Sequence, residues 1–366
     1  MNKKLIALAV LGACGAPAVM AQTANPVTLY GRVYATYESV QATNSPSGAP
    51  DVERRNRESD QASQLGVRGT EDLGGGLKAF FQLETAFKPD QNDSTFAGRN
   101  SAVGLQGNWG SILMGRWDTP YKVTTIAVDP YGDLTLGGIT AAVSGSGVRN
   151  VQAQFDRRDQ NVVQYWSPTW AGLAVRLSYS ANEGRCSAPT ASGCVNPGSN
   201  GASVTWTGGP VYVGYAYHEL KDTSFGTPIL PKQTANAIFG TFSFGPVKIG
   251  AVYDENKRTA PSGTTDYTKQ KAWLANIVWT IGNNQLSYQH QDAKDGELSS
   301  AAAQPACHVD SLGWQYNFTK RTFFLAQYVK IDNKDAGTCN WGANTLTLNS
   351  AGQDLTGFSL GLRHIF

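Results

Sequence analysis

Few residues in this sequence are placed to carry out catalysis. The four histidines are His218, His290, His308 and His364, and His290 is followed two positions later by Asp292. A histidine beside a carboxylate would suit a hydrolase with a Ser-His-Asp or Ser-His-Asn site, but that chemistry needs a serine on a sharp strand-to-helix turn. The segments around these residues alternate as β-strands do, and such strands would not build that turn. We therefore expect no enzyme, and a hydrolase is kept only as an alternative.

The cysteines favour disulfide bonds over a metal site. Four of them follow the N-terminal segment, and an even number in an exported chain is typical of disulfides. Cys186 and Cys194 bracket a loop rich in serine, proline and glycine, so we expect them to pair, which leaves Cys307 with Cys339. The metal alternative is weaker because the chain has no short C-x-x-C pair and His308 has no evident companion. We expect no metal and no cofactor.

Charged side chains gather around one long stretch, residues 117–148. The stretch lacks a clean two-residue alternation and is interrupted by glycines and prolines. The charged residues within it and at its edges are Asp118, Asp129, Asp133, Arg116, Arg149 and Arg158. A structureless connection of this length is usually functional or disordered. Two interpretations stay open: the stretch folds into the mouth of a β-barrel and narrows it, or it lies on the outer surface.

The chain begins as an exported protein does. Two lysines precede an apolar run at 5–13, and small residues at 19–21 suit a cleavage site, so residues 1–21 are expected to be a cleaved signal peptide. A lipidated Cys14 is the alternative. Cleavage before Gln22 removes two of the 30 basic residues and none of the 28 acidic ones, so the mature chain is near neutral and nucleic acid is not an expected partner. Because no later stretch approaches the ~20 apolar residues of a spanning helix, the exported chain is either soluble or a transmembrane β-barrel.

Period-two alternation in runs of about ten residues dominates the rest of the chain. In Val27–Tyr37 one face holds valine, leucine, glycine and alanine, while the other holds threonine, tyrosine and arginine; Leu77–Glu84 has a similar apolar face. The later alternating runs are 174–180, 211–217, 237–244, 247–253, 273–280, 285–290, 312–318, 323–331 and 358–366. With 40 glycines and only 16% charged residues, this composition is typical of a strand-rich chain.

Short and long connections alternate between these runs. The short ones are 71–76, 107–110, 167–172, 207–210, 244–246, 281–284 and 319–321, and the long polar ones are 38–60, 88–98, 117–148, 181–200, 219–233, 255–268, 293–306 and 332–354. They separate about sixteen strands. Short periplasmic turns, long external loops, a polar face toward a wet lumen and an apolar face toward lipid are typical of a transmembrane barrel. A secreted β-propeller or lectin is the alternative, although the repeat of ~40–50 residues that a propeller needs is not apparent.

Five motifs resemble a known family. They are VTLYGR at 27–32, SQLGVRGTEDLGGGLKAFFQLE at 63–84, NSAVGLQGNWGSILMGRWDTPY at 100–121, NVVQYWSPTWAGLAV at 161–175 and LGLRHIF at 360–366. In this order and across the mature chain, they are similar to the general diffusion porins of Gram-negative outer membranes, with the β-proteobacterial branch nearest. The resemblance implies an all-β fold, in which residues 22–366 form a 16-stranded antiparallel transmembrane β-barrel. It also implies that the third external loop, 117–148, folds into an aqueous pore as its constriction loop.

The resemblance has implications for partners as well. It implies a homotrimer in the cell outer membrane, surrounded by lipid and lipopolysaccharide. The last strand ends on Phe366 without a polar tail. Such an end suits both closure of the barrel and capture by the barrel-insertion machinery.

The resemblance also implies charged residues in the pore. In the family, basic side chains on the barrel wall face acidic groups on the third loop. The wall positions carried over are Arg32, Arg68, Arg99 and Arg158. Strict alternation would turn Arg99 outward, so its inward placement needs a bulge or a frayed strand end, and Arg157 is the alternative to Arg158. Where relatives often have an arginine in an S-R-L-G motif, this chain has Gln64, so one basic position is missing.

The acidic side of the constriction is less well matched. The loop lacks the Pro-Glu-Phe-Gly-Gly motif of many relatives, so Asp129 and Asp133, on either side of Tyr131, are the expected counterpart. Asp118 lies near the strand end. The other expected pore-lining residues are Gln64, Lys78, Gln82, Glu84 and Tyr131.

We expect passive diffusion of ions and small hydrophilic solutes. Rings of charged side chains set ion selectivity, and the wall arginines favour small anions mildly. A porin specific for one solute class is the alternative, in which Tyr30, Tyr34 and Phe80 would line a binding track. The disulfides are expected to shape the mouth of the pore and to matter little to conductance.

Overall fold

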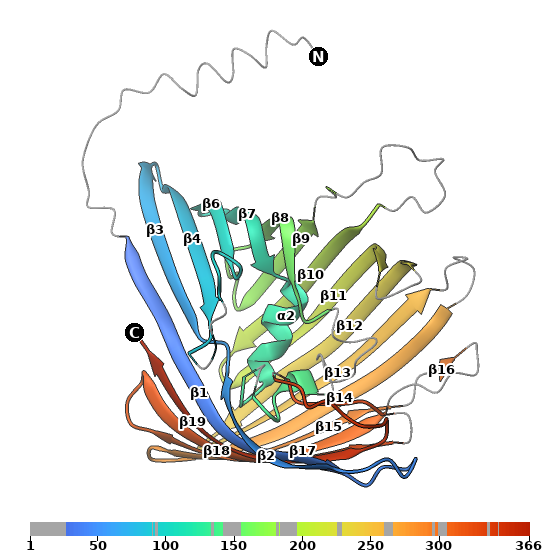
Figure 1. Ribbon diagram of the computed structural model, residues 1–366. Helices are drawn as coiled ribbons and strands as arrows, with labels where there is room; N and C mark the ends of the chain where they lie inside the picture. The colour runs from blue at the N-terminus through green and yellow to red at the C-terminus, as the bar shows by residue number, and fades with distance from the viewer. Residues whose placement is uncertain are drawn as a thin grey trace.

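One closed antiparallel β-sheet makes up the structure, a computed structural model (Figure 1). Its strands are β1 (Thr28–Thr43), β2 (Val52–Asp60), β3 (Gln64–Gly74), β4 (Leu77–Phe87), β5 (Ser94–Thr95), β6 (Ser101–Gly107), β7 (Gly110–Asp118), β8 (Arg158–Trp166), β9 (Leu173–Ser180), β10 (Gly198–Gly208), β11 (Val211–Ser224), β12 (Ile229–Phe244), β13 (Val247–Thr259), β14 (Asp266–Ile281), β15 (Asn284–Ala293), β16 (Glu297–Leu298), β17 (Cys307–Asn317), β18 (Thr322–Asn333) and β19 (Asp354–Ile365). Short helices are α2 (Pro120–Thr125), η1 (Ile126–Val128) and η2 (Ile139–Ala141).

The structure describes residues 27–89, 91, 94–132, 135–141, 155–180, 183, 196–224, 229–259, 266–294, 297–298, 306–334, 337–342 and 344–366. Within these ranges, no helix is long and apolar enough to cross a membrane.

Sixteen strands form the barrel once continuous segments are joined. β2 and β3 lie end to end along β1, which pairs with β3 from Thr28 to Arg32 and with β2 from Ala35 to Ala42. The two-residue strand β5 pairs with β4, as β6 does, so β5 and β6 count as one strand of the barrel. In the same way β16 pairs with β14, as β15 does, so β15 and β16 count as one strand. Counted in this way, the barrel has sixteen antiparallel strands, as the sequence predicts.

The two ends of the chain close the barrel. β1 pairs with β19 from Arg32, opposite Ile365, to Thr43, opposite Asp354. Beyond that ladder, the backbone N–H of Gly31 donates to the carbonyl of Phe366 at 3.2 Å, and the N–H of Phe366 donates to the carbonyl of Gly31 at 3.1 Å. A β-carbon at Gly31 would lie 2.6 Å from the Phe366 ring, so glycine is needed for this approach. The aromatic terminal residue therefore completes the closing strand pair.

Large apolar side chains cover the outside of the barrel. On β1, Leu29 and Tyr37 are 61% and 57% exposed, whereas Tyr34 on the opposite face is 4% exposed. Met114, Ile238 and other outward residues repeat this pattern on later strands. The alternation therefore has the sidedness that the sequence predicts, with apolar side chains toward lipid and polar ones toward the interior.

Several strands run further into polar sequence than the alternation predicts. β11 continues to Ser224, β12 begins at Ile229, β13 continues to Thr259 and β14 begins at Asp266. The predicted long connections 38–60, 219–233 and 255–268 are therefore partly wrong, because much of each is strand. Backbone hydrogen bonds continue these ladders, and cross-strand ion pairs on the outer face support them.

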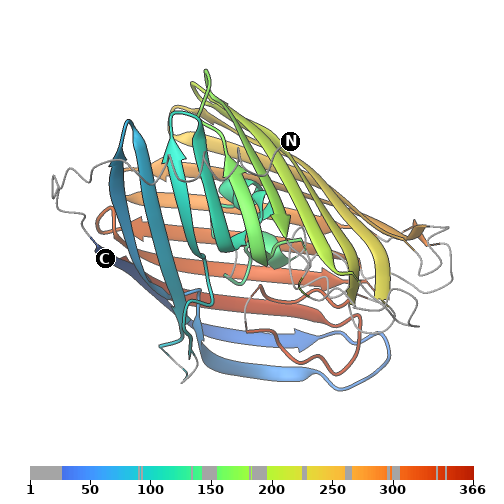
Figure 2. The ribbon, with the colours of Figure 1, turned by 90° about the horizontal axis from the view of Figure 1, so that it is seen from above.

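Two loops fill part of the interior. The inner loop (residues 119–157) carries α2 and η1 into the barrel, where Figure 2 shows them enclosed by the strands. The last loop (residues 334–353) also packs inside the barrel, against some of the same wall residues as the inner loop. Leu136 of the inner loop and Trp341 of the last loop are both 1% exposed or less and both approach Gly357 of β19. These contacts belong to one apolar cluster of buried residues inside the barrel.

Candidate functional site

The start of the inner loop is fixed to the wall by α2. The Thr119 hydroxyl accepts the N–H of Lys122 at 3.2 Å, which caps the helix, and Pro120 suits its first turn. The Tyr121 hydroxyl donates to Asp254 of β13 at 2.6 Å. Burial, and then the negative charge of Asp254, raise the pKa of Tyr121 well above its ordinary value, so the phenol stays a hydrogen-bond donor.

The middle of the inner loop is tied to the wall by Tyr131. Its hydroxyl lies 3.0 Å from the carbonyl oxygen of Ser287 on β15 and 3.1 Å from that of Ser311 on β17. The ring is 6% exposed, so Tyr131 anchors the loop to the wall and does not stand on the water-filled face expected from the sequence. A β-carbon at Gly313 would collide with this ring, which explains the glycine there.

Asp129 stabilises the fold of the loop itself. One carboxylate oxygen accepts the N–H of Tyr131 at 3.0 Å, and the other accepts the N–H of Ile139 at 2.7 Å. These bonds direct the carboxylate toward its own backbone. Its role as acidic counterpart of the wall arginines stays a prediction, and Asp133 lies outside the described residues.

Two glutamines hold the distal part of the loop. The carbonyl of Gly137 accepts the side-chain N–H of Gln289 at 2.9 Å and of Gln291 at 3.2 Å, and Gln291 also donates to Gly138 at 2.9 Å. A β-carbon on Gly137 would collide with the Ser311 hydroxyl. Polar wall residues and loop glycines therefore fit one another, and the loop is held along most of its described length.

Basic side chains lie on the inner face of β1, β3 and β4. Arg32 is on the face opposite Leu29, and its Nε donates to the carbonyl of Ala62 at 2.8 Å. Arg68 lies one strand away, with its guanidinium 4.8 Å from the centre of the Tyr30 ring. Lys78 of β4 is exposed on the corresponding face. Among the described residues, no carboxylate lies within ion-pair distance of Arg68 or Lys78.

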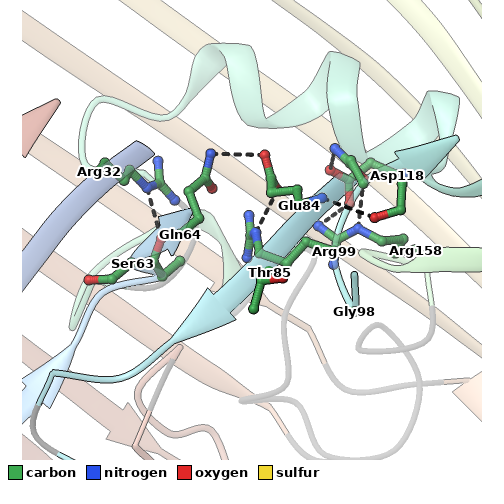
Figure 3. Close-up of polar contacts among 12 residues, drawn as sticks. Arg32, Ser63, Gln64, Glu84, Thr85, Gly98, Arg99, Asp118 and Arg158 are labelled. Carbon is green, nitrogen blue, oxygen red and sulfur yellow. Dashed lines mark hydrogen bonds and ion pairs between the residues drawn. The ribbon is translucent and has the colours of Figure 1, made fainter. Parts of the chain in front are cut away.

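Glu84 is the centre of a polar network on β4 (Figure 3). Its carboxylate accepts the Nε–H of Arg99 at 2.7 Å, the amide of Gln64 at 3.0 Å and the hydroxyl of Tyr30 at 3.1 Å. Arg99 precedes β6, so strand alternation does not apply to it and it turns inward. Glu84 is 4% exposed beneath these groups, and its charge is compensated by Arg99. Gln82 also faces this side and donates to the carbonyl of Asn100 at 3.0 Å.

Arg158 belongs to a second ion pair beside the first. Its Nη2 lies 3.0 Å from Asp118, and its Nε donates to the side-chain oxygen of Asn100 at 2.6 Å. Asn100 in turn donates to Asp118 at 2.8 Å. Arg99 and Arg158 are thus paired with carboxylates on their own wall, and both pairs lie close together in Figure 3. Arg157 instead pairs with Asp159 at 2.6 Å.

Sequence reasoning missed two contributors to this wall. Arg363 of β19 lies on the face opposite Leu362, with its guanidinium 4.1 Å from the centre of the Phe323 ring. The alternation in LGLRHIF could have placed it inward. Asp118 was not expected to be the acidic partner of the wall arginines because it lies near a strand end. In the structure it ends β7 beside Arg158 and forms an ion pair with it.

The histidine and serine residues that could suggest a hydrolase are packed within the barrel wall. His218 is fully buried, and its Nε2 lies 3.3 Å from the Ser199 hydroxyl, which also bonds to Asp159. A G-x-S-x-G string occurs at 357–361, but it lies inside β19, so Ser359 is on a strand and not on an elbow. Within the described ranges, no three histidine, cysteine or acidic side chains are grouped to hold a metal.

The aromatics of the predicted binding track also pack. Tyr34 stacks edge-on against Phe323 at 5.6 Å and is nearly buried, and Phe80 contacts the cluster around Trp117. Tyr30 is bonded to Glu84. None of these three forms an open aromatic surface, so the structure does not favour a solute-specific track.

A disulfide joins Cys307 of β17 to Cys339 of the last loop, which confirms this predicted pair. The side chain of Asn333 binds both sides of Cys339, donating to its carbonyl at 3.1 Å and accepting its N–H at 2.9 Å. Cys186 and Cys194 lie outside the described residues, so their pairing stays a prediction.

A closed barrel with an apolar exterior, a polar interior and a loop folded inside defines a channel protein of the outer membrane. Residues 7–336 match the family model for Gram-negative porins, and the chain belongs to that family. It is 29% identical to outer membrane porin protein 32 of Delftia acidovorans, with 100% of both chains covered. It is 27% identical to the major outer membrane protein P.IB of Neisseria meningitidis serogroup B, over 92% of this chain and 97% of that one.

A solved structure agrees with these relatives. The anion-selective porin from Comamonas acidovorans is 26% identical and has a TM-score of 0.74, covering 93% of this chain and 100% of that chain. The Delftia and Comamonas proteins are named as porins, which are channels and not enzymes. The chain is therefore an outer-membrane porin of a Gram-negative bacterium.

Proposed function

We propose that this porin is a water-filled channel for passive diffusion of ions and small hydrophilic solutes, with a mild preference for anions. The inner loop narrows the pore, and the passage runs between it and the wall of β1, β3 and β4. The observation that carries the proposal is that Arg68 and Lys78 lie on the inner face and that neither forms an ion pair with a carboxylate among the described residues, although Asp72 is the cross-strand neighbour of Lys78. The similarity to an anion-selective porin supports the same sign.

The magnitude of this preference follows from the pairing of the arginines. Because Arg99 and Arg158 are compensated by Glu84 and Asp118, they add little net charge. Two unit charges 4 Å apart interact by ~1 kcal/mol at the dielectric constant of water and ~4 kcal/mol at an effective value of 20. A wet pore is close to the first limit, so Arg68 would favour anions by a factor of about five to ten at low salt. The preference should fall as the Debye length shortens from ~10 Å at 0.1 M to ~3 Å at 1 M.

The mature chain is proposed to run from residue 22, after removal of residues 1–21, and to assemble as a homotrimer in contact with outer-membrane lipid and lipopolysaccharide. Support for the trimer comes from the family resemblance and from Phe96, which is 81% exposed between β5 and β6 and would be covered by a neighbouring copy. The C-terminal strand ending in Phe366 is the proposed signal for the barrel-insertion machinery.

The test is the reversal potential of the purified protein in a planar bilayer under a tenfold KCl gradient. We expect conductance to appear in steps of three and the reversal potential to have the sign of anion preference. Arg68→Gln with Lys78→Gln should move it toward cations. Cation preference in the unmodified protein would refute the anion proposal while leaving the channel, and absence of conductance would refute the channel itself.

A further inference from the structure

A charged cluster lies on the outer face of the barrel, toward the end with the long loops. Glu219 of β11 contacts Lys221 of the same strand at 3.1 Å and Lys232 of β12 at 2.9 Å. These positions share the outward face with Tyr215, which is 40% exposed. We call this group of Glu219, Lys221 and Lys232 the first clamp, because two ammonium groups close on one carboxylate.

The same arrangement recurs two strands further round the barrel. Glu255 of β13 contacts Lys257 at 3.3 Å and Lys269 of β14 at 3.0 Å. We call this the second clamp. Neighbouring strands are ~4.8 Å apart, and Glu255 lies two residues away from the register level of Glu219, so the two glutamates are ~12 Å apart. A repeated motif at this spacing matches a ligand that carries more than one anionic group.

A row of mainly aromatic side chains below the clamps indicates their level relative to the membrane. Tyr215, Ile238, Tyr253 and Trp273 are register partners across β11 to β14. Tyrosine and tryptophan gather at the head-group level of membranes. Glu219 lies four residues beyond Tyr215 and Glu255 two residues beyond Tyr253, which is ~13 Å and ~7 Å along the strands. The clamps therefore face the head groups of the outer leaflet.

The first clamp is built to present positive charge. Lys221 and Lys232 have side chains 54% and 51% exposed, and each ammonium has three N–H groups, of which the contact with Glu219 uses only part. The hydroxyl of Tyr217 also donates to Glu219 at 2.9 Å, which holds the carboxylate against the strand. Two ammonium groups around one carboxylate leave a local charge of about +1 on ordered side chains, and charge-assisted bonds to phosphate are strong.

We propose that the two clamps bind the phosphate groups of the phosphorylated glycolipid of the outer leaflet, lipopolysaccharide. The inference names the contact site for the lipid partner proposed above. It rests on the outer-membrane location of the protein and does not depend on the anion preference of the pore. The exposed lysines of the clamps would bind the lipid at the head-group level, whereas Arg68 and Lys78 lie on the inner face of the barrel.

The experiment measures binding of lipopolysaccharide to the full-length mature protein, folded in detergent from lipopolysaccharide-free material. Calorimetric titration gives Kd for intact lipopolysaccharide, for the same glycolipid after chemical removal of its phosphates, and for inorganic phosphate. The clamp variant is Lys221→Gln with Lys232→Gln. The matched control is Lys320→Gln with Arg321→Gln, which removes two exposed charges at the opposite end of the barrel. The heat-dependent gel mobility of folded barrels reports folding for every variant.

We expect the clamp variant to bind intact lipopolysaccharide roughly 20-fold more weakly, since each lysine near an anionic lipid surface contributes a factor of about five. The control should bind as the unmodified protein does, and dephosphorylated glycolipid should lose a similar factor. Equal binding by the clamp variant, or equal binding of the dephosphorylated glycolipid, would overturn the proposal. Tight binding of inorganic phosphate alone would assign the clamps to a free anion and overturn the lipid as ligand. Failure of the channel proposal would appear in conductance, which this titration does not measure.

Discussion

Replacing Glu84 by glutamine should increase the anion preference of the pore. In the structure its carboxylate compensates Arg99 at 2.7 Å, so the pair contributes almost no net charge. Glutamine keeps one side-chain oxygen as an acceptor for Arg99, and the fold of the wall should survive. The substitution leaves one guanidinium uncompensated. An anion passing ~8 Å away would gain ~0.5 kcal/mol at the dielectric constant of water and ~2 kcal/mol at an effective value of 20.

These energies correspond to a rise in the anion-to-cation permeability ratio of about twofold to about thirtyfold, and the water in the pore favours the lower part of that range. The assay is the reversal potential under tenfold KCl gradients. A gradient from 0.01 to 0.1 M should show the full shift, and one from 0.1 to 1 M a much smaller one, because the Debye length falls from ~30 Å to ~3 Å across these conditions.

Two further variants make the test of Glu84 specific. Arg99→Gln leaves Glu84 uncompensated and should shift the reversal potential toward cations. Glu71→Gln removes an exposed carboxylate from the outer side of the same hairpin and should shift it little. If the Glu84 and Arg99 variants both fold, yet shift the potential in the same direction or not at all at low salt, the pair does not face the permeation path and the reasoning is refuted.

Three other changes address the loops. Tyr131→Phe removes a donor shared by two wall carbonyls, worth ~1 kcal/mol, and should raise the open-channel current noise while changing mean conductance less than about twofold; a quiet channel would argue against this anchor. Trp341→Ala empties a fully buried site at a cost of ~3–5 kcal/mol, which should loosen the last loop, lower the Tm and increase conductance. Unchanged conductance with a lower Tm would mean that the last loop stabilises the fold but does not narrow the pore. Cys307→Ser with Cys339→Ser opens a closure of 32 residues worth roughly 4 kcal/mol in chain entropy, so the Tm should fall, whereas conductance should stay near that of the native protein because Trp341 still packs.

Alternation and loop lengths were enough to predict the barrel. A two-residue period predicts which side chains face lipid. A short turn between two such runs predicts which strands are neighbours. Strand length was predicted less well. On the outer face of β11 to β14 the ladders continue through charged residues such as Glu219, Lys232 and Glu255, so apolar alternation does not mark these parts of the strands.

The charges of the pore show where sequence reasoning stops. It proposed that wall arginines face acids on the loop, but Arg99 and Arg158 are paired within the wall, to Glu84 and Asp118. Such pairs join residues 15 and 40 positions apart and depend on how a strand end is turned, which alternation does not describe. The contact of Tyr131 with the wall depends on Gly313 of β17, in a distant part of the chain, so residue type alone gave no reason to separate an anchor from a pore-lining side chain.

The anchors of the inner loop also determine when the pore acquires its final shape during folding. The hydroxyl of Tyr121 reaches a residue 133 positions later in the chain, and that of Tyr131 reaches residues 156 and 180 positions later. Contacts of such long range form late, because a large chain closure must precede them. The inner loop therefore has no wall to dock against until the C-terminal half of the barrel has folded. The last stage before the native state is expected to be a closed cylinder with an undocked loop, a wider and less selective hole than the mature channel.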